Sequence, residues 1–143
     1  MTIEEGYYSY LTSVSAITAL VSTRVFPLFV PQSLAGASQD SRFPCLVYRS
    51  QLQVRGKSNA GTNGLNKTRI ETHCWSTTDA LAGALATTVI SNLKNQHKTT
   101  WGTVKISNCN VESDDENLEQ MVGNDGLLKF GVIFTASVWF IEQ

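Results

Sequence analysis

The sequence predicts an α+β protein, with a mostly antiparallel sheet of four to five strands and two helices packed on one face. Two segments have apolar residues at helical spacing, one near the N-terminus and one after the middle of the chain. The segments between and after them are rich in β-branched and aromatic residues and are separated by glycine- and asparagine-rich turns. Strands joined by hairpins, with helices gathered on one side, are typical of this fold class.

The first helix is expected from about Ile3 to Leu20. Apolar residues recur there at steps of three and four, at Ile3, Tyr7, Tyr10, Leu11, Val14, Ile17, Leu20 and Val21. Thr2 followed by Glu5 matches a capping box at the start of this helix. The next segment, Arg24–Val30, has strand composition but contains Pro27, which cannot donate to a central ladder. It therefore predicts a short edge strand or an extended connector.

A two-stranded antiparallel hairpin is expected in the middle of the chain. Phe43–Arg55 alternates with an imperfect period of two, and Leu65–Trp75 again has strand character. Between them, glycine and asparagine are dense, which is typical of turns and disfavours regular elements. The sequence therefore predicts a long, mobile hairpin loop over about Val54–Asn66, preceded along the chain by a small, polar loop at Gln32–Asp40.

The second helix and two further strands complete the predicted fold. Ser76 is the expected N-cap, with Asp79 as its acidic partner, and the helical spacing continues to about Leu93. A fourth strand is expected at Trp101–Val111. The last strand, Leu128–Phe140, alternates most clearly and is expected to be central in the sheet.

Length and charge limit the function classes. The chain has 143 residues, of which 42% are hydrophobic, so residues 1–143 are expected to form a single domain around one core. Lys plus Arg number 11 against 12 for Asp plus Glu, a balance that argues against a dedicated nucleic-acid binder. The apolar run Gly131–Ile141 is shorter than the roughly 18 residues of a membrane span. With no secretory signal pattern and an odd set of cysteines, we expect synthesis in a cytoplasm.

The segments that invite catalytic or ligand-binding interpretations lack the rest of each pattern. Gly56–Ser58 resembles the end of a phosphate-binding loop, but Gln51 stands where the first glycine is needed. His73 and Cys74 are neighbours, so on a strand they point to opposite faces and cannot bind one metal ion together. Asp114–Glu116 lacks the spacing of a calcium loop. We expect no cofactor and no metal, and a small hydrolase using Cys74 or His73 is a less favoured alternative.

Opposite charges are concentrated in two blocks of the sequence. Between Arg42 and Arg69 every charged residue is basic, and between Glu112 and Asp125 every charged residue is acidic. Copies of such a chain can pack head to tail, and heterologous contacts of this kind can close into a ring. The hypothesised subunit contacts place Arg49, Arg55 and Lys57 against Glu112, Asp114 and Asp115. The alternatives are that both blocks are solvated, that they pair within one molecule, or that the basic block contacts DNA.

Short segments along the whole chain together resemble one family. They are Tyr10-Leu11, Arg24-Val25-Phe26-Pro27-Leu28, Val30-Pro31-Gln32, Phe43-Pro44-Cys45-Leu46-Val47-Tyr48, Arg69-Ile70-Glu71, Trp75-Ser76 and Val138-Trp139-Phe140. In these segments the chain resembles the tail-completion proteins of long-tailed bacteriophages and prophages, which include tail terminators and tail-to-head joining proteins.

The resemblance implies a non-enzymatic virion protein with a fold similar to tail terminators. Such proteins form a ring, commonly a hexamer, on the head-proximal end of the tail tube, where they stop its polymerisation and form the surface that joins the head. The implied partners are the tail tube protein and head-tail connector proteins, with no membrane, and DNA passes through the ring without specific binding. The hairpin loop is expected to reach toward the tube or the lumen. The alternative is a capsid-side connector subunit, which binds portal or adaptor proteins instead.

Overall fold

The computed structural model describes residues 1–28, 43–58, 61–112, 117–122 and 128–141. Within these ranges the chain forms three helices, α1 (Ile3–Ser13), α2 (Ser15–Val21) and α3 (Asp79–Leu93). The strands in the same ranges are β1 (Val25–Pro27), β2 (Cys45–Ser58), β3 (Gly61–Ser76), β4 (His97–Trp101), β5 (Val104–Val111), β6 (Asn117–Val122) and β7 (Leu128–Ile141). No helix in the described part of the chain is long and apolar enough to span a membrane.

The described strands form one sheet in the order β1-β2-β3-β7-β5-β4, with β6 also paired to β7. β1 pairs parallel with β2, and the other pairs are antiparallel. One edge of β7 carries β3, and its other edge carries β6 near its start and β5 near its end. The prediction of a mostly antiparallel α+β fold with the last strand central is therefore confirmed, but the sheet has more strands than the four to five expected.

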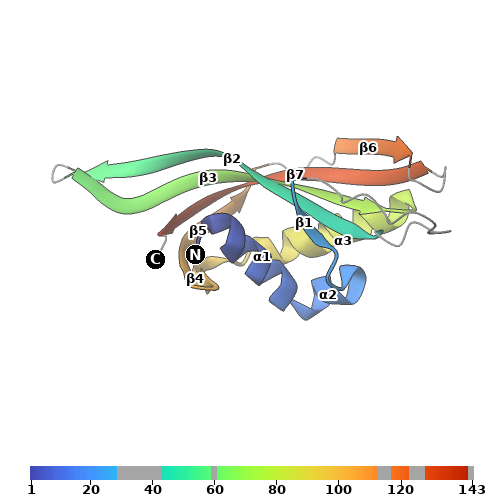
Figure 1. The fold of residues 1–143 in the computed structure, drawn as a ribbon, viewed down its shortest axis with the longest axis horizontal. Helices are drawn as coiled ribbons and strands as arrows, with labels where there is room; N and C mark the ends of the chain where they lie inside the picture. The colour runs from blue at the N-terminus through green and yellow to red at the C-terminus, as the bar shows by residue number, and fades with distance from the viewer. Residues whose placement is uncertain (29–42, 59–60, 113–116, 123–127, 142–143) are drawn as a thin grey trace.

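All three helices lie on the same face of the sheet (Figure 1). The first predicted helix, however, is two helices, because Val14 has an extended backbone with ψ 114°. The hydroxyls before this break bond backward to backbone carbonyls, Thr12 to Tyr8 and Ser13 to Tyr10. Such local bonds favour bending and ending a helix. The predicted capping box of Thr2 and Glu5 is present, whereas Thr78, and not Ser76, caps α3.

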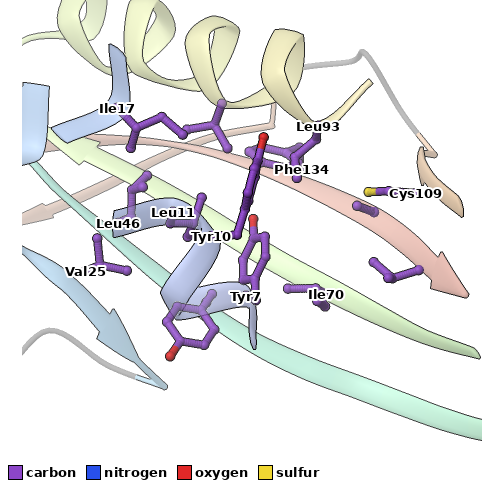
Figure 2. Close-up of a cluster of buried hydrophobic side chains, with 14 of the residues drawn as sticks. Tyr7, Tyr10, Leu11, Ile17, Val25, Leu46, Ile70, Leu93, Cys109 and Phe134 are labelled. Carbon is purple, nitrogen blue, oxygen red and sulfur yellow. The ribbon is translucent and has the colours of Figure 1, made fainter. Parts of the chain in front are cut away.

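The core lies between the helices and the sheet. Figure 2 shows Tyr7, Tyr10 and Leu11 of α1 pointing toward strand residues such as Ile70 and Phe134. The Tyr7 hydroxyl bonds the buried Thr72 hydroxyl at 2.8 Å, which satisfies both groups inside the core. Burying each large apolar side chain contributes about 1.5–3 kcal/mol.

The prediction that Val54–Asn66 forms a loop is wrong. β2 and β3 continue through most of this segment, pairing Arg55 with Asn66 and Ser58 with Gly61, so that only residues 59–60 connect the strands. The register shifts between Arg55 and Lys57, on either side of Gly56, and such irregularities are where glycine is tolerated inside a strand. Pairing of β3 with β7 begins at Asn66. Beyond that point, residues 56–58 and 61–65 form a two-stranded ribbon. This ribbon and residues 52–55 of β2, which lead into it, are here called the arm, which extends beyond the helical layer in Figure 1.

The C-terminal half also differs from the prediction. Most of the expected strand Trp101–Val111 is β5, but Trp101 ends the preceding strand β4. The two strands are joined by a turn at Gly102, whose φ of +63° favours glycine. His97 begins β4. β6 has no counterpart in the prediction. The predicted loop at Gln32–Asp40 lies outside the described residues.

Candidate assembly interface

The sheet has an outer face that no described helix covers. Along β3 the even-numbered residues from Thr68 to Cys74 are buried. Because side chains alternate along a strand, the odd-numbered residues from Lys67 to Trp75 lie on the opposite, outer face. This face has an apolar end, where Phe43, Cys45, Val47 and Trp75 form a second buried cluster. Charged residues, among them Arg49, Glu71, Arg69 and Glu112, lie farther along this face.

Glu71 is the centre of the first charged group on the outer face. Its Oε1 lies 3.2 Å from Arg49 Nη2 and 2.5 Å from His73 Nε2. The side-chain amide of Gln51 also donates to this carboxylate. Partial burial raises the pKa of Glu71, but the hydrogen bond and charge of His73, together with Arg49, outweigh it and hold the pKa below its ordinary value.

Glu112 is the centre of the second charged group. The Ser137 hydroxyl donates to one of its oxygens, and Arg69 donates to the other from Nε at 3.0 Å and Nη2 at 2.7 Å. These hydrogen bonds, led by that of Ser137, lower the pKa of Glu112. Arg69 belongs to the basic block and Glu112 to the acidic block. At this point, the two blocks pair within one molecule.

The structure describes four of the six residues of the hypothesised subunit contact. Arg49 and Glu112 are on the outer face, and each has the partner within the chain described above. Arg55 and Lys57 are in the arm, at register positions opposite Asn66 and Thr62. Asp114 and Asp115 lie outside the described residues. Half of the Arg49 side chain is nevertheless exposed, and surface ion pairs of this kind contribute at most about 1 kcal/mol, so Arg49 can exchange partners at low cost.

A cation-π contact at the base of the arm was missed by the sequence analysis. Lys67 Nζ lies 4.9 Å from the ring centre of Trp139, and the two residues are partners in the β3–β7 register. Both side chains are half-buried. The alternation of β7 predicts that Trp139 lies on the face opposite the core residues. That Lys67 is its partner follows only from the pairing of β3 with β7.

The acid sensitivity of the fold is predicted to depend on Glu71 and Glu112. A carboxyl with a lowered pKa in the folded state stabilises the fold above its ordinary pKa of 4.5, and this stabilisation is lost as the pH falls through the folded value. We therefore expect stability to decrease below about pH 4.5. The double variant Glu71→Gln/Glu112→Gln is expected to lose less stability than the native chain between pH 6 and pH 3, in urea unfolding at each pH. An identical loss for both proteins would contradict this account.

The residues that invited catalytic interpretations are not brought together. Cys74 is buried on the helix side of the sheet and His73 is on the outer face, as their adjacency in a strand predicted. Burial, with a smaller contribution from Cys45, raises the pKa of the Cys74 thiol, and burial raises that of Cys109 to about 12. High thiol pKa values disfavour the reactive thiolate. Gly56–Ser58 is part of β2, and among the described residues no three His, Cys, Asp or Glu side chains form a metal-binding group.

Comparison with solved structures finds a similar fold. No protein-family model matches the chain, and no curated protein matches it. Among solved structures, the chain is similar to a chain of the "Virion of native gene transfer agent (GTA) particle", with a TM-score of 0.57. The alignment covers 95% of this chain and 92% of that chain at 16% sequence identity. The similarity at this identity shows a shared fold, over nearly the whole length of both chains.

Proposed function

We propose that this chain is a structural protein of a virion. The observation that carries the proposal is the fold shared nearly end to end with a chain of a gene transfer agent virion. Because one fold can serve several functions, the shared fold supports a class of protein and leaves its position in the particle to other arguments. The resemblance of the sequence to tail-completion proteins supplies that position.

Within the virion, the proposed role is to cap the head-proximal end of the tail tube as a ring, commonly a hexamer. The ring ends polymerisation of the tube and forms the surface that joins the head, and DNA passes through its lumen without specific binding. The proposed partners are the tube protein and the head-tail connector proteins. A sheet stiffened by helices on one face gives a rigid protomer, and the arm gives it a projection that can reach a neighbour, the tube or the lumen.

Measuring the elongation of tail tubes with and without this chain tests this function. We expect tube protein from the same source to form tubes of uncontrolled length alone and to stop elongating when this chain is added. Arg55→Glu/Lys57→Glu changes two positions in the arm and is expected to weaken the arrest while leaving the circular dichroism spectrum unchanged. Lys98→Glu/Lys105→Glu makes the same change of net charge at exposed positions on β4 and β5, and it is expected to arrest growth normally.

Two results would contradict the terminator role. If tubes elongate unchanged at saturating protein, the chain does not cap them. If the chain instead binds the purified portal complex, it is the capsid-side connector subunit.

A further inference from the structure

A groove lies on the exposed side of α1, where the helix begins beside β1 and β2. It has a volume of about 700 Å³, and its walls include Met1, Glu4, Glu5, Tyr8, Pro27 and Tyr48. Tyr8 and Met1 are 41% and 45% exposed. The groove thus presents aromatic and aliphatic surface next to two carboxylates.

Exposed apolar side chains gather around this groove. Large hydrophobic residues with substantial exposure in the described part of the chain are Met1, Tyr8, Leu20, Leu28, Leu81 and Ile141. Met1 and Tyr8 line the groove, and Leu28, which is 68% exposed, directly follows its wall residue Pro27. Gathered apolar surface with a polar rim is characteristic of an interaction site.

The arm has properties that complement the groove. Its end, residues 56–58 and 61–65, is a two-stranded ribbon to which no other described strand pairs, and such a ribbon is only marginally stable in water unless it packs against another surface. Its sequence combines the apolar residues Leu52 and Val54 with the basic residues Arg55 and Lys57, and it contains no acidic residue. A basic segment with aliphatic residues suits an apolar groove with two carboxylates.

The arm cannot reach the groove of its own chain as a straight ribbon. Ser50 of β2 donates a hydrogen bond to Glu4 of α1, so the arm starts beside the groove. From there to Ser58, β2 extends by about 25 Å at the ordinary rise of a strand, and in Figure 1 this end of the ribbon lies beyond all three helices. An arm that binds in the groove must therefore come from a second copy.

We propose that the arm of one copy binds in the α1 groove of the next copy. The arm and the groove are different surfaces, so the contact is heterologous, and repeating it through one rotation closes a ring. The placement of this contact in a tail ring rests on the proposed function. The inference adds to that function the two surfaces that join the subunits. In this contact the partners of Arg55 and Lys57 are Glu4 and Glu5.

Disulfide trapping between two single-site variants tests the contact. Ser58→Cys places a thiol at the end of the arm, and Ser9→Cys places one in the wall of the groove. The native cysteines are all buried and do not compete. In an equimolar mixture under mild oxidation, with and without tubes, the Ser58–Ser9 crosslinked dimer is expected in several-fold excess over dimers formed with Thr100→Cys, an exposed control position on β4. Equal yields at the two positions in both conditions would overturn the proposal.

Charge-neutral variants test the role of the two carboxylates. Glu4→Gln/Glu5→Gln keeps the oxygens that accept from Ser50 and Thr2, so the capping box and the start of α1 are retained. Introduced into the Ser9→Cys chain, the pair of substitutions is expected to reduce trapping several-fold. Tyr8→Asp is expected to do the same, and Tyr8→Phe is the matched control that keeps the apolar wall. Unchanged trapping in both Glu4→Gln/Glu5→Gln and Tyr8→Asp would overturn the proposal.

The crosslinking and tube-growth experiments distinguish failure of this contact from failure of the proposed function. Trapping in the absence of tubes with no arrest of tube growth supports the contact and rejects the terminator role. Arrest of tube growth without trapping at Ser9 in either condition supports the terminator role and rejects the contact.

Discussion

Trp101→Ala is expected to lower the free energy of unfolding by about 3–5 kcal/mol. Trp101 is 1% exposed and joins β4 to α1. Its ring stacks on Tyr10 at 5.1 Å and lies 5.4 Å from the ring of Tyr7, and its indole nitrogen donates to Gln96 at 3.0 Å. The truncation removes all of these contacts at once and leaves a cavity, so it is the largest single loss that we expect.

Two variants separate the contributions of Trp101. Trp101→Phe keeps an aromatic ring against Tyr10 but loses the indole donor, so its loss is expected to be clearly smaller than that of the alanine variant. Equilibrium unfolding in urea measures both. A loss below about 1 kcal/mol for Trp101→Ala would show that α1 does not depend on this ring, and the description of the core would be wrong there.

Gly131→Val is expected to destabilise the fold by about 1–3 kcal/mol, although valine is favoured in strands. Gly131 is opposite Trp75 in the β3–β7 register. A Cβ atom at this position would lie 2.7 Å from Trp75 Cε3, closer than van der Waals contact permits. The indole therefore has to move, and the apolar cluster on the outer face moves with it.

A second glycine and a double-mutant cycle are the controls for Gly131. A Cβ added to Gly83 in α3 meets no atom within 4 Å, so Gly83→Ala is expected to raise stability by up to about 1 kcal/mol. Trp75→Leu creates space beside Gly131, and the cost of Gly131→Val is expected to be smaller in that background. An equal cost in both backgrounds would show that the indole is not the cause.

The elements that could be predicted are those whose local pattern agrees with their packing. The apolar stripe of α1 faces the core at Ile3, Tyr7, Tyr10 and Leu11. The alternation of β7 places the even-numbered residues from Val132 to Phe140 on the helix side, as a central strand requires. The capping box at Thr2 depends only on residues three apart and was also predicted correctly. In each case, information within a few residues is sufficient.

The elements that were missed depend on contacts between distant segments. The density of glycine and asparagine in the arm predicted a loop, but register shifts between β2 and β3 accommodate it within two paired strands. β6 contains few strand-forming residues and is defined by its pairing with β7. The helix break at Val14 depends on hydroxyls that bond carbonyls one turn earlier, and the helical spacing of apolar residues continues across it.

The candidate interface was predictable only in part. The two charge blocks were visible in the sequence, but the pairing of Arg69 with Glu112 joins positions far apart in the chain and follows only from strand order. Glu5 was considered only as the capping-box partner of Thr2, and Glu4 had no predicted role. A useful signal was present, because Tyr8 lies off the apolar stripe of the first helix and is a large aromatic residue on its exposed side. An aromatic residue beside two acids on a solvated helix face indicates a contact surface.

Electron microscopy of tube ends is the most direct test of the central claim that this chain caps a virion tail. Purified protein is mixed at saturation with tubes of the tail protein from the same source, and both ends of each tube are imaged. The account predicts a ring of this chain at one end of each tube and bare tube walls. Tubes with both ends bare, or with the chain bound along their walls, would contradict it.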